Sequence, residues 1–299
     1  MSVSKQSWPE FFFSGAPHIK SNSDRFQHFP CDNWKVGERV SRDIPLGRPI
    51  LVQWLYAKEN DIEFVYVAKS FPEYPEHEAL VRLQRIPSER HSLEDLKYEL
   101  DRLLKEARAH ERISRFCPVS RKIYFPQYYG VLTDIPRSHF PDRYQLRPRA
   151  VVLEAIRPYP ASWRILAAER LLGVVQNFGT RLKHLPLSQF EVEWYQSLFD
   201  NRLRRVNTLY NIGITHGDVR DEHFRMPGDF YDSVLYDFSN AYTFSPSWSY
   251  SVNCGTPRPL SCIRQSEQRQ IEDQIYQRAE QMDLRDHFAN QYRVSPSVI

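Results

Sequence analysis

Apolar positions in the N-terminal half of the chain occur in short runs that are typical of β-strands. The runs 49–56 and 62–71 are rich in β-branched and aromatic residues, and the polar stretch 58–61 lies between them. They therefore predict two strands joined by a turn. Two further apolar runs, 123–132 and 150–156, predict a third and a fourth strand.

Other segments carry a helical hydrophobic period. Ser92-Leu93-Glu94-Asp95 has a helix-capping signature, and apolar residues then recur at three- and four-residue intervals to about residue 115. This pattern predicts one continuous helix. Helical patterns also cover three later segments, 162–183, 187–207 and 265–288. Loops are predicted for two Pro-rich stretches, 72–87 and 242–262.

The order of these elements predicts an α+β fold. Strands, one helix and more strands come first, and helices with one hairpin follow them. The segment Arg157-Pro158-Tyr159-Pro160 breaks the pattern between the two regions. We therefore expect an irregular N-terminal arm over 1–40, a small sheet-rich lobe over 41–157 and a larger, helical lobe over 158–299.

Composition narrows the possible functions. The chain has 299 residues, of which 41% are hydrophobic and 26% are charged, and this suits a globular protein. Its net charge is +3, from 40 basic and 37 acidic residues. That balance argues against a nucleic-acid partner and against an anionic membrane surface.

Cysteine spacing and hydropathy limit the cellular compartments in which we expect this protein. The chain has 4 cysteines and none of them forms a C-x-x-C pair, so we expect neither a zinc site nor a disulfide framework. The sequence has no apolar leader at its start and no run of 18 apolar residues. These features predict a cytoplasmic or nuclear protein without a membrane span.

Two aspartates carry the strongest chemical signal. Asp218 stands in His216-Gly217-Asp218, and Asp237 follows an apolar segment 237 − 218 = 19 residues later. Pro227-Gly228-Asp229 between them predicts the turn of a hairpin. Such a pair suits phosphoryl transfer, in which one carboxylate accepts the proton of an attacking hydroxyl and the other holds Mg²⁺.

The two motifs resemble the catalytic loop H-R-D-x-x-x-x-N and the metal loop D-F-G of protein kinases. The H-G-D form is also similar to that of small-molecule kinases of the aminoglycoside and choline type. The resemblance implies ATP as the nucleotide, Asp218 as the base and Asp237 as the main Mg²⁺ ligand. It also implies that Arg220 lies where protein kinases often carry a phosphate-directed lysine.

The resemblance extends into the N-terminal half. Val67-Ala68-Lys69 looks like the V-A-I-K strand, whose lysine reaches the nucleotide phosphates and pairs with a helix glutamate. Among the glutamates of the predicted helix, Glu106 is favoured as that partner. The carbonyl of Glu154 and the amide of Ile156 would contact adenine, although an ordinary core strand explains these residues equally well.

The chain departs from the kinase pattern in three ways. It lacks a glycine-rich phosphate loop, and it has no A-P-E motif in the 299 − 239 = 60 residues that follow Ser239. His223 stands where the catalytic-loop Asn is expected. Because neutral imidazole suits Mn²⁺ better than Mg²⁺, His223 indicates a Mn²⁺ site, a one-metal site or a purely structural residue.

Three hypotheses follow from the sequence. The first is an ATP-dependent phosphotransferase with a bilobal, kinase-like fold that acts on a hydroxyl of a protein or a small molecule. The second is a pseudokinase that serves as a nucleotide-binding or protein-interaction scaffold. The third is an unrelated α+β domain in which the lysine is a strand-end residue, Asp237 is a cap and Arg220 is a solvated loop residue.

Overall fold

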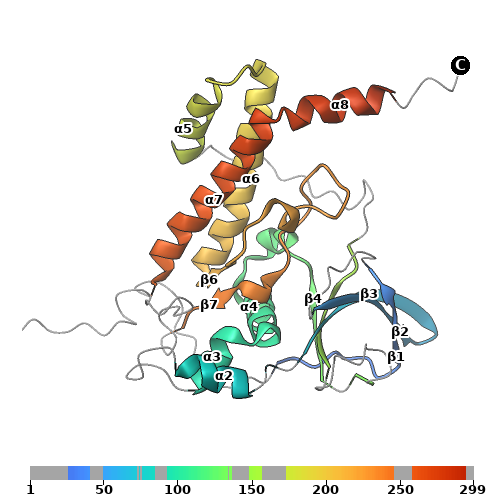
Figure 1. Cartoon of the computed structure of the whole chain (residues 1–299). Helices are drawn as coiled ribbons and strands as arrows, with labels where there is room; N and C mark the ends of the chain where they lie inside the picture. Colours follow the sequence, from blue (N-terminus) through green and yellow to red (C-terminus); the bar gives the residue numbers. More distant parts are fainter. Residues whose placement is uncertain are drawn as a thin grey trace, which may run out of the picture.

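The structure is a computed structural model, and it describes residues 26–40, 50–72, 74, 76–84, 93–133, 135–136, 148–156, 173–245 and 258–293. Figure 1 shows an antiparallel sheet built from the N-terminal part of the chain and a group of helices built from the C-terminal part. This arrangement is a mixed α+β fold, as the order of elements predicts. The predicted break at 157–160 and the segment 162–172 lie outside the described residues.

Five strands form the sheet in the part of the chain that the structure describes, in the order β1-β2-β3-β5-β4. All neighbouring strands are antiparallel. The bounds are β1 Trp34–Arg39, β2 Leu51–Glu59, β3 Ile62–Phe71, β4 Tyr128–Leu132 and β5 Arg149–Glu154. The predicted strand 62–71 coincides with β3, and the predicted strands 49–56 and 150–156 overlap β2 and β5.

The edge strand β1 was not predicted, because residues 1–40 were expected to be irregular. Its sequence WKVGER has little apolar alternation, and none of its residues is fully buried. Pairing with β2, with Trp34 opposite Ala57 and Val36 opposite Leu55, makes it a strand. An edge strand of this kind is defined by its neighbour and leaves a weak trace in the sequence.

The predicted helix from residue 92 to about 115 is divided into α3 Leu93–Leu100 and α4 Arg102–Phe116. Asp101 separates them, because its side chain accepts hydrogen bonds from the amides of Leu103 (3.0 Å) and Leu104 (3.3 Å) and so caps α4. Asp101 also pairs with Arg149 of β5 at 3.0 Å, which ties the start of α4 to the sheet.

Two other predictions on either side of these helices were wrong. The stretch 72–87 was expected to be a loop, but it contains the helix α2 Glu76–Leu83. The predicted strand 123–132 begins only at Tyr128, because the preceding residues belong to the 3-10 helix η2 Val119–Tyr124 and to a connection that includes Pro126. Proline has no amide hydrogen to donate to a strand, so β4 starts after it.

The C-terminal part contains four α-helices within its described ranges: α5 Gly173–Leu182, α6 Gln189–Asn211, α7 Leu260–Glu280 and α8 Asp283–Arg293. Ser188 and Glu191 form a capping box at the start of α6. The predicted helix 265–288 is two helices, because Met282 adopts a left-handed conformation (φ 54°) between α7 and α8. The predicted loop 242–262 contains β7 Tyr242–Thr243, which pairs with β6 Ile214–Thr215, and the start of α7.

Helix α4 joins the two parts of the fold (Figure 1). Leu103 and Ala107 pack into the sheet-side core with Phe71 of β3, whereas Ala109 and Ile113 belong to the main core of the helical part. The helix thus brings its polar residue Glu106 to the boundary between the sheet and the helices. Among the described helices, none is both long and apolar enough to cross a membrane.

Candidate active site

Lys69 joins the sheet to the helical part through two carboxylates. Its side chain is buried on β3, and Nζ lies 2.8 Å from Oε2 of Glu106 on α4 and 2.6 Å from Oδ1 of Asp237. The contact that the sequence predicts between Lys69 and Glu106 is therefore present. The additional contact with Asp237 crosses 168 residues of sequence.

Lys69, Glu106 and Asp237 each stabilise the charged form of their partners. Burial alone would lower the pKa of Lys69, but the carboxylates of Asp237 and Glu106 outweigh it and raise that pKa. Burial would raise the pKa of each carboxyl group, but the ammonium of Lys69 keeps the pKa of both below their ordinary values. All three side chains are therefore charged at neutral pH, and one cation is shared by two anions.

Asp237 adopts a left-handed conformation (φ 66°, ψ 70°) at the start of the 3-10 helix η6 Phe238–Asn240. Oδ1 accepts hydrogen bonds from the amide (3.3 Å) and from Oγ (2.7 Å) of Ser239. Ser239 stands where the resemblance to D-F-G would place a glycine, and its hydroxyl orients the carboxylate of Asp237. The ring of Phe238 is buried and packs against His110 and Phe125, which holds this turn against the core.

Asp218 is paired with Arg220 two residues later. Nη2 of Arg220 donates to Oδ2 of Asp218 at 2.9 Å, and Nε lies 2.8 Å from Oδ1. Nδ2 of Asn240 is a second and longer donor to Oδ2, at 3.4 Å. The sequence analysis did not single out Asn240, although its position three residues after Asp237 is a signal that it lies close to the two aspartates.

Two histidines brace the loop that carries Asp218. His216 is buried, which lowers its pKa to about 4 with help from the neighbouring His223, so its ring is neutral. Its Nδ1 accepts a hydrogen bond from the amide of Asp218 (3.3 Å), and its Nε2 donates to the carbonyl of Tyr236 (2.9 Å). His216 thus ties the loop of Asp218 to the strand-like segment that precedes Asp237.

His223 connects the two aspartates. Its Nδ1 donates to the backbone carbonyl of Asp218 at 2.7 Å, and its Nε2 lies 3.4 Å from Oδ2 of Asp237. Because a carbonyl can only accept, Nδ1 carries a proton, and Nε2 faces the carboxylate of Asp237. A cation bound between this nitrogen and the carboxylate would contact both groups.

This pair fits a metal ion only in part. A carboxylate oxygen and an imidazole nitrogen suit Mn²⁺ better than Mg²⁺, which prefers oxygen ligands alone. Over the described ranges, no group of three or more His, Cys, Asp or Glu side chains could hold a metal. Asp237 and His223 would therefore supply two ligands, and the phosphates of a nucleotide and water would supply the others.

The backbone of the loop is held by a glutamate from α7 that the sequence analysis missed. Glu267 is buried and accepts hydrogen bonds from the amide of Gly217 (2.5 Å) and from the hydroxyl of Tyr210 (2.7 Å). It lies 50 residues beyond Gly217 on α7. The buried residues Ile263 and Ile271 stand four positions before and after it, and this spacing is the signal that distinguishes it from the other glutamates of the helix.

The segment between the two aspartates forms the predicted turn around Pro227-Gly228-Asp229, but its arms at 224–237 are not assigned as strands. Two backbone hydrogen bonds join the arms, from Ser233 to Phe224 (2.8 Å) and from Tyr236 to His223 (3.1 Å). The hydroxyl of Tyr236 adds bonds to the carbonyls of Glu222 (2.5 Å) and Arg225 (2.8 Å).

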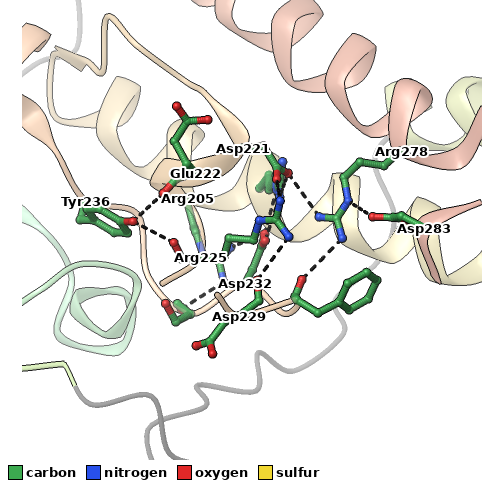
Figure 2. A network of polar contacts seen from close by, with 12 residues as sticks. Arg205, Asp221, Glu222, Arg225, Asp229, Asp232, Tyr236, Arg278 and Asp283 are labelled. Carbon is green, nitrogen blue, oxygen red and sulfur yellow. Dashed lines mark hydrogen bonds and ion pairs between the residues drawn. The ribbon is translucent and has the colours of Figure 1, made fainter. Parts of the chain in front are cut away.

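A buried ion network anchors this hairpin to the helices, as Figure 2 shows. Arg202 of α6 is buried and pairs with both oxygens of Asp232 at 2.8 Å and with Asp221 at 2.6 Å. Arg278 of α7 reaches Asp221 at 3.2 Å and also pairs with Asp283 of α8. Since Asp221 is three residues from Asp218, the network also fixes the loop that carries Asp218.

The backbone groups predicted to contact adenine are bonded to each other. The amide of Ile156 donates to the carbonyl of Glu154 at 3.1 Å, and the amide of Glu154 donates to the carbonyl of Gln127 at 2.9 Å. The Ile156 amide would have to leave this turn before it could donate to a ligand. Binding of adenine by these two residues stays a prediction.

No protein-family model matches the sequence, and no curated protein matches it. The function is therefore argued from the geometry of the site.

Proposed function

We propose that this protein is an ATP-dependent phosphotransferase that moves the γ-phosphate to a hydroxyl acceptor. The observation that carries the proposal is the shared position of Lys69 between Glu106 and Asp237. A buried lysine that is held by two carboxylates from distant parts of the chain is costly to build, and perturbed charged groups of this kind concentrate at functional sites.

Each residue has a role that its contacts support. Lys69 would bind the nucleotide phosphates while Glu106 holds its ammonium in place. Asp237 would hold Mg²⁺ or Mn²⁺ together with His223, and the metal would neutralise the phosphate charge that develops during transfer. Because Lys69 already contacts Asp237, phosphate and metal would enter a site in which both charged groups are oriented.

Asp218 would accept the proton of the acceptor hydroxyl. In the structure its carboxylate is paired with Arg220, whose side chain is 41% exposed. An exposed guanidinium can exchange this partner for a phosphate, with which it forms strong, bidentate hydrogen bonds. Exchange of Arg220 from Asp218 to the γ-phosphate would free the base at the moment when the nucleotide is bound.

The alternative is a pseudokinase that acts as a nucleotide-binding or protein-interaction scaffold. The closed pair between Asp218 and Arg220 and the bonded amide of Ile156 favour it, because both leave groups of the proposed site engaged within the protein. This alternative shares the fold and the contacts of Lys69 with the first proposal. It differs in requiring no turnover.

Thermal unfolding with ATP, with and without Mg²⁺ and Mn²⁺, is the first test. A ligand at 100 times its dissociation constant stabilises a protein by about 2.7 kcal/mol. We expect a metal-dependent rise of the melting temperature that is lost in Asp237→Ala and retained in Asp229→Asn. Asp229 is a matched control because it lies in the same hairpin, at the turn. No shift at millimolar nucleotide would contradict nucleotide binding.

Turnover separates the two proposals. Release of ADP from ATP in the presence of Mn²⁺ should fall at least about a hundredfold in Asp218→Asn, in line with the contribution of a general base. The thermal shift with ATP should persist in that variant. Wild-type protein that binds ATP and forms no ADP with any hydroxyl-bearing acceptor pool would favour the scaffold.

A further inference from the structure

A pocket of about 470 Å³ lies along the C-terminal half of α4, where His110 stands one helical turn beyond Glu106, the partner of Lys69. It lies between the C-terminal half of α4, the 3-10 helix η2 and the start of β4, with Glu154 at the end of β5 on one wall. Its described lining does not include Lys69, Asp218 or Asp237, but it includes Glu154, whose backbone carbonyl is predicted to contact adenine. The volume falls within the range of small-molecule sites, so the pocket is large enough for a ligand of one to two rings.

The inner wall of the pocket is a buried histidine with one long contact to an acid. His110 is 1% exposed, and among the described residues neither ring nitrogen has a hydrogen-bond partner of normal length. Oε1 of Glu106 lies 3.6 Å from Nε2, and this interaction helps to lower the pKa of Glu106. Since buried polar groups are nearly always bonded, the ring could form a hydrogen bond with a ligand.

The remaining walls combine flat apolar surface with one cation. Tyr128 stacks on His110 with ring centroids 5.7 Å apart and an interplanar angle of 12°, and Ile113, Ile123 and Phe125 are further apolar lining residues. Lys122 donates to the carbonyl of Ser114 at 2.6 Å, which leaves other N–H groups of its ammonium for a partner.

The described pocket lining contains one carboxylate side chain and one ammonium side chain. Glu154 contributes a carboxylate that accepts from the amide of Gln127 at 3.0 Å, and Lys122 contributes the ammonium. An anionic group of a ligand would be repelled by the first and attracted by the second. The lining thus favours an aromatic molecule with one anionic group that is directed toward Lys122.

The same histidine is in contact with the candidate active site. The rings of His110 and Phe238 meet edge to face with centroids 5.0 Å apart, and Phe238 directly follows Asp237. His110 also lies one helical turn from Glu106, the partner of Lys69. A ligand that moves this ring would therefore also displace α4, which carries Glu106, and the turn that carries Asp237.

We propose that this pocket is a regulatory site for an aromatic, singly anionic small molecule, and that its occupation is coupled through His110 and Phe238 to the Lys69–Glu106–Asp237 group. The claim that the pocket binds a ligand depends only on its lining residues. The claim that this ligand affects nucleotide binding also rests on the proposed function. Coupling between two sites is reciprocal, so it can be measured from either ligand.

The test uses 8-anilinonaphthalene-1-sulfonate, a fluorescent aromatic sulfonate, as the probe. Ser114→Trp at the mouth of the pocket should weaken its binding by about tenfold or more, through loss of space. Lys122→Gln should weaken it by about threefold, as expected for one partly exposed charge pair. Two matched controls, Thr180→Trp on α5 and Arg121→Gln on η2, should bind the probe as the wild type does.

The possible outcomes distinguish a failure of the pocket proposal from a failure of the proposed function. If the wild type and all four variants bind the probe with equal affinity, the proposal that this pocket is a ligand site is overturned, whether or not ATP binds. If ATP with Mn²⁺ binds and leaves the probe affinity unchanged, the coupling is overturned. If ATP does not bind at all, the proposed function fails, while the comparison of the four variants still decides whether the pocket binds an aromatic anion.

Discussion

The backbone carbonyl of Asn240 packs directly against the α-carbon of Gly217, in the space that a Cβ atom would occupy. Gly217 also has a left-handed φ of 78°. In the resemblance to the kinase motif H-R-D, Gly217 stands at the arginine position, and this close packing leaves no space there for a side chain. A side chain at this position would separate the loop of Asp218 from the turn that follows Asp237.

Substitution of Gly217 should therefore be strongly destabilising. Gly217→Ala combines the cost of a left-handed non-glycine residue, about 1–2 kcal/mol, with that of overpacking, about 1–3 kcal/mol. Gly228→Ala is the matched control, because Gly228 has a similar φ of 86° and open space around its Cβ position. We expect urea unfolding to give a loss of about 3 kcal/mol for the first and about 1 kcal/mol for the second. Equal losses would refute the proposed close packing.

Removal of Lys69 should cost more than removal of its partner Glu106. Lys69→Met leaves the buried carboxylate of Glu106 and the partly buried carboxylate of Asp237 without their shared cation, whereas Glu106→Gln leaves Lys69 paired with Asp237. Loss of one member of a buried ion pair typically costs about 3–5 kcal/mol. We expect Lys69→Met to lose about 4 kcal/mol of unfolding free energy and Glu106→Gln about half of that.

Lys58→Met is a control for the loss of a lysine from this sheet, because Lys58 is 52% exposed and pairs with the solvated Asp61. It should change stability by less than about 1 kcal/mol. A larger loss for Glu106→Gln than for Lys69→Met would mean that Lys69 is not the centre of the charged group.

Arg202 should be a residue that lysine cannot replace. Arg202 holds Asp232 with two parallel hydrogen bonds and Asp221 with a third, and a lysine has no planar fork to make them together. We expect chemical denaturation to show a loss of about 3 kcal/mol in Arg202→Met and a substantial loss in Arg202→Lys. Arg181→Met, which removes a 44% exposed arginine from its pairs, should cost about 1 kcal/mol or less. Wild-type stability of Arg202→Lys would argue against the bidentate geometry.

The capping box of α6 should add a pH-dependent contribution to stability. Hydrogen bonds from Arg285, together with those from Ser188, lower the pKa of Glu191 to about 2 from its ordinary value of 4.5. The unfolded chain therefore binds a proton at a higher pH than the folded one. The stabilisation is present above pH 4.5 and is lost as the pH falls toward 2.

We expect a contribution of about 1 kcal/mol, because Arg285 is half exposed and solvent weakens the pair. Glu191→Gln should remove this part of the pH dependence between 4.5 and 2 in acid unfolding experiments. Glu193→Gln, in the first turns of the same helix and exposed, should leave it intact. If the stability of Glu191→Gln falls with pH between 4.5 and 2 as steeply as that of the wild type, the lowered pKa of Glu191 is contradicted.

Local patterns were sufficient for much of the sheet but not for the contact that defines the site. The run of β-branched and aromatic residues placed β3 at residues 62–71, and this strand carries Lys69 into a buried position. A lysine in such a strand requires a carboxylate, and the following helical segment offered several glutamates. The resemblance to the kinase pattern, rather than the helical period, favours Glu106 among them.

Breaks in helices were harder to predict. Asp101 ends one helix and begins the next by capping, and Met282 interrupts the C-terminal helix in a left-handed conformation. An aspartate or a methionine inside an apolar period is compatible with an unbroken helix. The break depends on contacts such as that of Asp101 with Arg149, which comes from another strand.

The sequence by itself determined the types of the main elements and the identity of the charged residues at the site. Tertiary structure decided that Lys69 is shared by two acids, that Asn240 and Glu267 support the loop of Asp218, and that His110 separates a pocket from the site. The reason is physical. Strand and helix periods arise from neighbours along the chain, whereas these contacts join residues that are from 22 to 168 positions apart and are chosen by packing.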